Sequence, residues 1–470
     1  MGVVVRIVKR MLLAAALAAA ALPLGMFGRS TPQAPARTVP IKHVVVIYLE
    51  NQSFDSVLGF WCNDHHGRCP DGGMPDRVKL SNGAMVTPSV NPDTVPEVQH
   101  STTYQQDAID GGKMDGWQKI AGCSASQHYA CVSGYQPGQV PNLSLLAQDF
   151  AISDRTFSMQ DSSSWFGHLY AIAASTDGFT GNGPGIQTTP GYGWGCDSGK
   201  TVLWHGQQVP SCIPDPALSL PHGGAFESTP VPYVPTILDR LDAAGLSWRL
   251  YGATCATESV SSQGLETCTS ATSGYIWATC PSFAECLYHQ ESGMSQDTQF
   301  PADAKAGNLP AFSLVTPAKG VNSWHNGYSI TQGDNYLGNL VRAVMDGPDW
   351  SSTAIFITFD DCGCFYDQVP PGTNPDGTPQ GPRAPLVIVS PYARPGYTDT
   401  TPTTFAGILA YTEHTFGLRS LSKNDASAYD FTNAFNYSQA PLKPVQMTNT
   451  ALPPSARHLK ITKAEADDPT

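Results

Sequence analysis

The sequence predicts an α/β protein with a mostly parallel central sheet between two layers of helices. Short apolar runs rich in β-branched and aromatic residues recur along the chain, and such runs are typical of strands buried on both faces. Helical patterns, such as residues 234–244 and 335–345, lie between them, and this alternation favours a three-layer sandwich. The expected strands are His43–Leu49, Phe150–Ser153, Ser247–Tyr251, Ala311–Val315, Ala354–Phe359 and Pro385–Val389.

Composition and charge exclude several classes of protein. Of the 470 residues, 41% are hydrophobic and 14% are charged, so the chain can bury a large core and lacks the signature of disorder. Acidic residues outnumber basic ones by 39 to 26, which gives a net charge of −13. Because nucleic-acid-binding proteins show the opposite balance, no nucleic acid is expected as a partner.

The first thirty residues have the layout of a secretory signal peptide. A basic segment precedes an uncharged apolar run at residues 11–24, and residues 31–40 are polar and rich in proline. We therefore expect a signal peptide at 1–30, a linker at 31–40 and a secreted or periplasmic protein. A retained membrane anchor is the alternative, but the apolar run is shorter than the roughly 20 residues of a full span.

The twelve cysteines agree with export, since none lies in the signal segment and their number is even. Several form short-range pairs in loops rich in glycine, serine and proline, which is typical of disulfides in an oxidising compartment. Zinc binding is the alternative, but no pair of CxxC motifs occurs. We predict disulfides, with a connectivity that the sequence alone does not define.

Two of the expected strands end in side chains that offer oxygen ligands. Glu50 and Asn51 follow the first strand, and Asp360 and Asp361 follow the fifth. In an open α/β sheet, ligands collect at the carboxyl ends of the strands. Three carboxylates and one amide meeting there would form a hard site for one Ca²⁺, Mg²⁺ or Mn²⁺ ion. Simple capping of a strand end is the alternative for each pair taken alone.

Around these residues the sequence resembles the phosphoesterase family that joins bacterial phospholipases C with certain acid phosphatases. The resemblance implies a fold like that of alkaline phosphatase and a single divalent metal held by Glu50, Asn51 and the two aspartates. It spans roughly residues 40–437. The matching stretches, in order, are Ile41–Asp55, Gly112–Gly116, Leu241–Tyr251, Trp350–Pro371 and Gly381–Pro391.

The resemblance also implies the extent of the domains. We expect a phosphoesterase catalytic domain at 41–440, with insertions near 178–232 and 255–301 that carry little periodicity or many cysteines. Residues 441–470 are expected to form a C-terminal tail.

A hydroxyl nucleophile is part of the same resemblance. Family members carry a Ser or Thr four residues before an Arg or His, and His168 in this position selects Ser164. A helical pattern begins just after Ser164, and a helix N-terminus favours a phosphate through its free amides and its dipole. Capping of this helix is the alternative role of Ser164. Phe166 and Gly167 replace the family's Pro-Asn pair.

Two histidines match positions where the family contacts phosphate. His100 and His325 are therefore expected to hold the non-bridging oxygens together with Asn51. Gln368 replaces a histidine that is usual in the family, and residues 401–404 occupy a segment where another often lies, so not every family contact carries over. No general acid for the leaving group can be assigned.

These residues predict an exported, metal-dependent hydrolase of phosphoric esters that forms a phosphoseryl intermediate. We expect an acid phosphatase acting on phosphomonoesters, because few residues follow the matched region and the acidic chain would be repelled by anionic lipid. Phospholipase C acting on phospholipid head groups is the alternative. A sulfatase is disfavoured because its Cys/Ser-x-Pro-x-Arg signature is missing. A secreted, metal-stabilised binding protein is the alternative from a different class.

Overall fold

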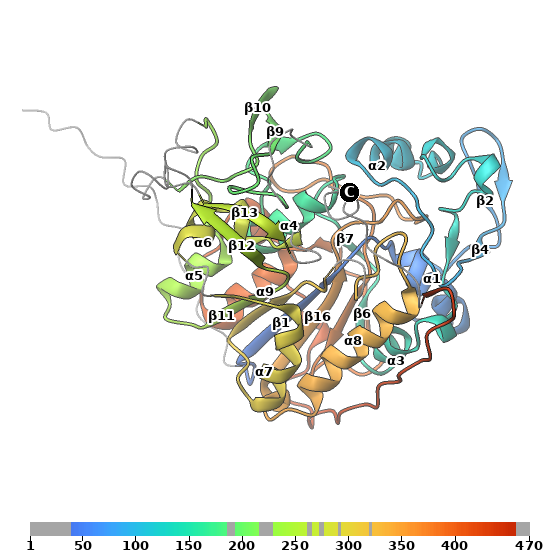
Figure 1. Ribbon diagram of the computed structural model, residues 1–470. Coiled ribbons are helices and arrows are strands. Elements are labelled where there is room, and N and C mark those ends of the chain that lie inside the picture. Colours follow the sequence, from blue (N-terminus) through green and yellow to red (C-terminus); the bar gives the residue numbers. More distant parts are fainter. Residues whose placement is uncertain are drawn as a thin grey trace, which may run out of the picture. The chain divides into compact units, whose positions relative to one another are not determined.

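An eight-stranded sheet forms the centre of the fold in the computed structural model (Figure 1). Its strand order is β14-β11-β15-β1-β16-β17-β6-β18. In chain order these strands are β1 (His43–Leu49), β6 (Ala151–Ser153), β11 (Trp248–Tyr251), β14 (Met294–Ser295), β15 (Phe312–Val315), β16 (Thr353–Phe359), β17 (Leu386–Val389) and β18 (Thr398–Asp399).

The structure describes most of the chain. The described ranges are 39–185, 193–215, 229–260, 266–271, 277–289, 293–318 and 322–456, with 257–260, 266–271 and 289 described by their backbone only. The predicted signal peptide, nearly all of the predicted linker and residues 457–470 of the predicted tail lie outside them.

Most neighbouring strands of the sheet run parallel. β1 pairs in parallel with both β15 and β16, whereas β17 is antiparallel to both of its neighbours. Every residue of β16 and all but the first of β1 are buried, as their continuous apolar runs predict. The α/β class with a mostly parallel sheet is therefore confirmed.

Helices cover both faces of this sheet, with α7 and α8 on one face and α9 on the other (Figure 1). α3 packs against α8, and α4 and α10 pack against α9. The helices are α1 (Phe54–Asp64), α2 (Thr102–Ile109), α3 (Pro141–Asp149), α4 (Ser164–Ala173), α5 (Ile237–Ala243), α6 (Ala284–His289), α7 (Phe300–Ala306), α8 (Ile330–Met345), α9 (Ala406–Phe416) and α10 (Lys423–Ser427).

Short strands outside the central sheet were not predicted. Three of them form a small sheet of order β10-β9-β8 inside the insertion near 178–232. Strands of two to six residues are too short to give a recognisable periodicity in the sequence. They are β2 (Val78–Lys79), β3 (Met85–Val86), β4 (Ser89–Val90), β5 (Ser133–Gly134), β7 (Thr156–Phe157), β8 (Phe179–Thr180), β9 (Thr201–Trp204), β10 (Gln207–Pro210), β12 (Cys255–Val260), β13 (Glu266–Ala271) and β19 (Thr403–Thr404).

Disulfides hold several loops, in agreement with the prediction from the cysteine pattern. The bonded pairs are Cys62–Cys69, Cys123–Cys131, Cys196–Cys212 and Cys280–Cys286, and Cys255 is bonded too. Cys362 and Cys364, by contrast, are free and buried. The sequence pattern named no pairs, and these two cysteines lie in the turn that directly follows β16.

The described part of the predicted tail runs over α3 and α8 as irregular backbone up to residue 455. Asn142 and Asn335 bind it, accepting hydrogen bonds from the backbone N–H groups of Thr448 (2.7 Å) and Thr450 (2.8 Å). Across the described ranges, no helix has the length and apolar character needed to cross a membrane.

Candidate active site

The four predicted metal-binding residues meet at one edge of the central sheet. Because β1 and β16 are adjacent and parallel, Glu50 and Asn51 emerge beside Asp360 and Asp361. The backbone N–H of Asn51 donates a hydrogen bond to Oδ1 of Asp360 at 2.9 Å. All four residues are buried, with at most 1% of their surface exposed. The structure thus brings together four oxygen-bearing side chains from two strand ends.

Irregular backbone carries these side chains beyond the strands. Asn51 has a φ of 61°, which is unusual for a residue other than glycine. Gly363 has a φ of 55°, and a Cβ there would lie 2.2 Å from the carbonyl oxygen of Asn51. Only glycine therefore allows this close approach of the two turns. Strained backbone of this kind is common at functional sites.

Ser164 lies at the first turn of α4, directly after the N-cap residue Ser163. Its hydroxyl donates a hydrogen bond to Oδ1 of Asn51 at 3.3 Å. Gly167 allows this approach, because a Cβ at that position would lie 2.9 Å from the carbonyl oxygen of Asp360. The departure from the family's Pro-Asn pair thus places a glycine where the helix meets the end of β16.

His100 and His325 face the amide of Asn51. The Nδ1 atom of each ring contacts a backbone carbonyl, that of Val98 at 3.0 Å and that of Asn326 at 2.9 Å. A carbonyl only accepts hydrogen bonds, so Nδ1 carries a proton and Nε2 of a neutral ring is an acceptor. Both Nε2 atoms lie near one terminal atom of the Asn51 amide, at 3.0 and 2.9 Å. The amide nitrogen, with two protons, satisfies both rings.

The other terminal atom of this amide, its oxygen, faces further oxygens. It lies 3.1 Å from Oδ1 of Asp360 and 3.1 Å from Oδ1 of Asp361, in addition to the contact with Ser164. Oxygen acceptors packed this closely repel one another unless a cation lies among them. If the oxygen and nitrogen of the Asn51 amide were exchanged, the nitrogen would donate hydrogen bonds to both aspartates without a cation. The oxygen would then have to accept from Nε2 of both histidines, which would require both rings to be doubly protonated.

Asp361 gives a second indication that the donor set fits a cation. Its Oδ2 atom is buried and has no hydrogen-bond partner among the described residues. Burial, together with the negative charge of Asp360, raises the pKa of Asp361 well above its usual value. A bound divalent ion would relieve this electrostatic stress. Carboxylate and amide oxygens are the ligands that Ca²⁺, Mg²⁺ and Mn²⁺ prefer.

His168 joins this cluster, although sequence reasoning used it only to locate Ser164. Its Nε2 atom lies 3.0 Å from Oε1 of Glu50, and ligand atoms of Glu50, His168 and Asp360 lie within 4.8 Å of one another. Burial lowers the pKa of His168 to about 4, so the ring is neutral at ordinary pH and able to bind a metal. Its spacing of four residues from Ser164, on one face of a helix, was the available signal.

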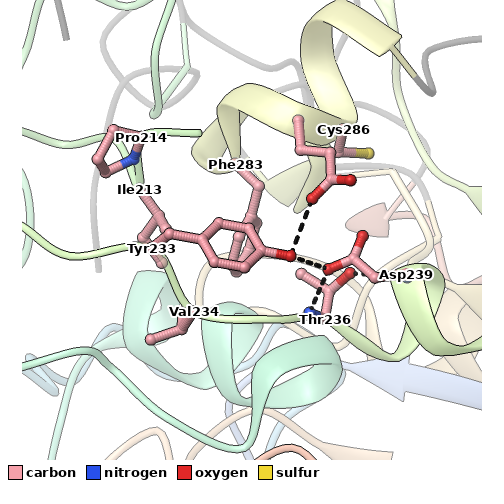
Figure 2. Close-up of a pocket in the computed structure, with 9 residues that line it drawn as sticks. Ile213, Pro214, Tyr233, Val234, Thr236, Asp239, Phe283 and Cys286 are labelled. Carbon is pink, nitrogen blue, oxygen red and sulfur yellow. Dashed lines mark hydrogen bonds between the residues drawn. The ribbon is translucent and has the colours of Figure 1, made fainter. Parts of the chain in front are cut away.

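A separate pocket lies between the segment before α5 and the start of α6 (Figure 2). Tyr233 projects into it, with its hydroxyl 2.8 Å from Oδ2 of Asp239 and 3.1 Å from Oε2 of Glu285. None of the predicted site residues belongs to its lining, which consists of Ile213, Pro214, Tyr233, Val234, Thr236, Asp239, Phe283, Glu285 and Cys286. The residues suited to phosphate chemistry therefore lie elsewhere, at the sheet edge.

Fold and site together define a class of α/β protein in which a serine at a helix N-terminus faces an oxygen-rich cluster at the carboxyl ends of parallel strands. The chain belongs to the Phosphoesterase family, whose model matches residues 41–419. The predicted family is thereby confirmed.

Named relatives include phospholipases C. Non-specific phospholipase C4 of Arabidopsis thaliana is 25% identical over 414 residues, covering 78% of this chain and 64% of the relative, so the chain spans just under two thirds of that protein. Phospholipase C A of Mycobacterium tuberculosis is 24% identical over 460 residues, covering 87% and 79%. A crystal structure from Vibrio parahaemolyticus, described as a protein in the alkaline phosphatase superfamily, aligns with a TM-score of 0.34 and 12% identity, covering 85% and 71%.

Proposed function

We propose that this protein is a metal-dependent hydrolase of phosphoric esters with Ser164 as its nucleophile. The observation that carries the proposal is the hydroxyl of Ser164, which lies at the start of α4 and 3.3 Å from the Asn51 oxygen within the oxygen cluster. Membership of the Phosphoesterase family supports the reaction class. The names of the relatives, which are phospholipases C, support it further.

Glu50, Asn51, Asp360 and Asp361 would hold the metal, with His168 beside Glu50 as a nitrogen donor or as a partner that orients the carboxylate. When bound, a divalent ion would supply Lewis acidity, lowering the pKa of a nearby hydroxyl and neutralising phosphate charge. The identity of the ion is proposed from the hard donor set as Ca²⁺, Mg²⁺ or Mn²⁺.

Ser164 would attack phosphorus in line, forming an Oγ–P bond as the bond to the leaving oxygen breaks. Water would then displace the serine and release phosphate. The N-terminus of α4 stabilises negative charge on the phosphoryl group during both steps. His100 and His325, whose Nε2 atoms face the Asn51 amide nitrogen, would hold that amide with its oxygen directed at the metal. A contact of either ring with a phosphate oxygen, as the resemblance implies, would replace its contact with this amide.

We propose phosphomonoesters as the substrates, since the charge of −13 disfavours binding to anionic lipid surfaces. Phospholipase C is the second candidate, favoured by the names of the relatives. We also propose that the chain is exported, on the strength of the signal-like N-terminus and the disulfides.

One experiment tests the class and the substrate together. Turnover of p-nitrophenyl phosphate, bis-p-nitrophenyl phosphate and micellar phosphatidylcholine is measured with and without a chelator. We expect hydrolysis of the monoester that the chelator abolishes. A preference for the lipid by about tenfold or more in kcat/KM would replace the phosphatase by a phospholipase C, and no hydrolysis of any ester would contradict the proposed function.

A further inference from the structure

One fully buried arginine joins the turns that follow β1 and β16. The guanidinium of Arg383 donates from Nη2 to Oδ1 of Asp55 at 2.9 Å, and from Nε to both carboxylate oxygens of Asp367 at 3.1 Å. Neither the arginine nor the two aspartates has any exposed surface. The ring of Phe54 lies beneath the guanidinium, 4.2 Å away. These three charged residues are called the Arg383 triad below.

The triad connects all three segments that carry the proposed chemistry. Asp55 follows the Glu50-Asn51 turn, and Asp367 ends the turn that begins at Asp360. The third contact of Arg383 runs from Nη1 to the carbonyl oxygen of Asp154, 2.9 Å away, on the segment that leads to Ser164. A single side chain thus contacts the start of α1 after the first ligand-bearing turn, the end of the second turn, and a residue ten positions before Ser164.

Each turn also binds the other through the triad's carboxylates. The backbone N–H of Asp55 donates to Oδ2 of Asp367 at 3.2 Å, and the backbone N–H of Gln368 donates to Oδ2 of Asp55 at 3.1 Å. Burial, with the charge of Asp367, raises the pKa of Asp55 to about 8, and the guanidinium of Arg383 opposes this rise by supplying positive charge between the two carboxylates.

Sheet pairing alone does not fix the ligands. The register of β1 against β16 ends at Leu49 and Phe359, one residue before the first ligand on each strand. Beyond that point the backbone is irregular, with Asn51 and Gly363 at positive φ. The backbone N–H of Asp360 still donates to the carbonyl oxygen of Leu49 at 3.0 Å. The remaining ligands depend on contacts made within and beyond both turns.

We propose that Arg383 is a positioning residue that sets the separation of the two ligand-bearing turns and thereby the affinity of the site for its divalent ion. This inference rests on the metal site of the proposed function. The planar guanidinium binds two carboxylates at once, whereas a lysine ammonium offers a single point charge. Residues that hold metal ligands in place change metal affinity by about 10- to 100-fold when they are altered.

The test measures binding of Mn²⁺, Ca²⁺ and Mg²⁺ by calorimetry to the metal-free wild-type protein and to Arg383→Lys. The matched control is Arg155→Lys, because Arg155 also pairs with an aspartate, Asp71, at 2.7 Å but contacts neither ligand-bearing turn through its side chain. We expect Arg383→Lys to bind the preferred ion about 10- to 100-fold more weakly and the control to bind it like wild type. Saturating metal should restore kcat in Arg383→Lys, which a merely structural defect would not allow.

Equal metal affinity in wild type and in Arg383→Lys would overturn the inference and leave the proposed function intact. Failure of the wild-type protein to bind any of the three ions would instead refute the proposed metal site. If Arg383→Lys does not fold, the neutral triple variant Arg383→Met, Asp55→Asn, Asp367→Asn removes the buried charges together. A folded triple variant with weak metal binding supports the inference. Wild-type affinity in that variant, or its failure to fold as well, counts against a role in positioning.

Discussion

The two turns of the proposed active site and the disulfide-bonded loops outside it both consist of irregular backbone, but different interactions hold them. The turn from Asp360 to Asp367 contains two cysteines that stay free, and it is held by the buried charges around Arg383. The insertion near 178–232 is closed by Cys196–Cys212, and the start of α6 by Cys280–Cys286. The buried ion pairs place particular side chains precisely, whereas the disulfides limit the freedom of a loop.

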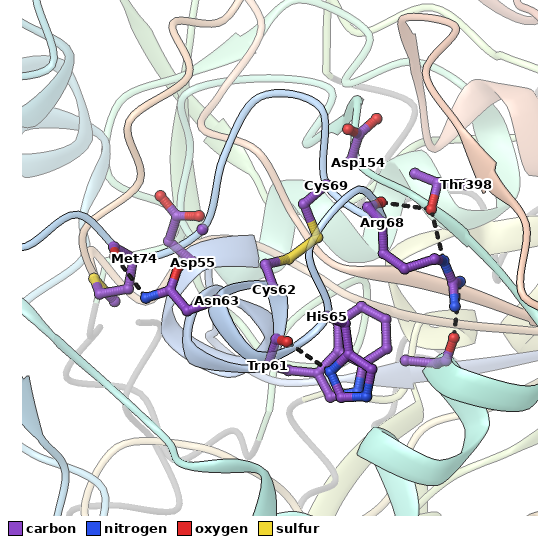
Figure 3. Close-up of a disulfide and its surroundings, with 12 residues drawn as sticks. Asp55, Trp61, Cys62, Asn63, His65, Arg68, Cys69, Met74, Asp154 and Thr398 are labelled. Atoms are coloured by element: carbon purple, nitrogen blue, oxygen red, sulfur yellow. Dashed lines mark hydrogen bonds between the residues drawn. A yellow bond between two sulfur atoms is a disulfide. The ribbon is translucent and has the colours of Figure 1, made fainter.

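The Cys62–Cys69 loop at the end of α1 shows the disulfide-bonded arrangement (Figure 3). His65 stacks on Trp61 with ring centroids 4.2 Å apart, and Arg68 donates to the backbone carbonyl of Ala147 at 3.0 Å. A disulfide stabilises such a loop mainly by limiting the unfolded chain. Charged hydrogen bonds, by contrast, define direction and distance within the folded state. Disruption of the proposed site should therefore lower activity, and removal of a loop disulfide should lower stability.

The largest effect is expected from Ser164→Ala. Loss of the proposed covalent nucleophile should lower kcat by about 10³-fold or more without a change in melting temperature. Ser163→Ala is the matched control, because the neighbouring Ser163 hydroxyl is buried and has no hydrogen-bond partner in the described part of the chain. Activity of Ser164→Ala within about tenfold of wild type would refute the assignment.

Removal of the carboxylates after β16 should abolish metal binding. Elemental analysis of purified wild-type protein should give about one divalent ion per chain, and the double variant Asp360→Ala, Asp361→Ala should retain almost none. The exposed aspartates Asp64 and Asp76 are distant from Asp360 in the sequence, so the same double replacement there serves as the control for charge. Unchanged metal content in the first variant would exclude this site.

Removal of the Cys62–Cys69 disulfide should lower stability and leave activity nearly unchanged. Replacement of Cys62 and Cys69 by alanine opens a loop with a sequence separation of 7, which predicts a loss of about 2 kcal/mol in the free energy of unfolding. Because this disulfide contacts none of the proposed catalytic residues, kcat/KM should stay within about twofold of wild type at a temperature where both proteins are folded. A large loss of activity without a loss of stability would contradict a purely stabilising role for this disulfide.

Glu413 on α9 is a buried carboxylate of a different kind. Among the described residues it has no close ion pair such as the one between Arg383 and Asp55. Burial, with a contribution from Asp425, raises the pKa of Glu413 to about 10. The folded protein therefore keeps a proton that the unfolded chain loses above its ordinary pKa of about 4.3. Stability from this group is present below that pH and declines as pH rises toward 10.

Glu413→Gln removes this dependence on pH. Relative to wild type, its free energy of unfolding should become larger as pH rises from 5 to about 8, which means a relatively more stable variant, as measured by urea denaturation at several pH values. A constant difference between the two proteins over this range would contradict the raised pKa.

The main strands and the four proposed ligands were predictable, because continuous apolar runs identify buried strands and polar residues directly follow them. The role of Arg383 was not, since its partner Asp55 lies 328 residues away and no local pattern reports such a contact. His168 was similarly overlooked because its contact with Glu50 arises only when α4 approaches the end of β1. The free cysteines were not predicted, because an even number of cysteines does not indicate which of them pair.

The stereochemical course at phosphorus tests the central claim, transfer of the phosphoryl group through Ser164, most directly. Each in-line displacement inverts the configuration of phosphorus, so a route with a phosphoseryl intermediate gives two inversions. A phosphoric ester made chiral by sulfur and an oxygen isotope is hydrolysed in isotopically labelled water, and the configuration of the released thiophosphate is determined. The account predicts net retention. Net inversion would show direct attack by water and would contradict a covalent role for Ser164.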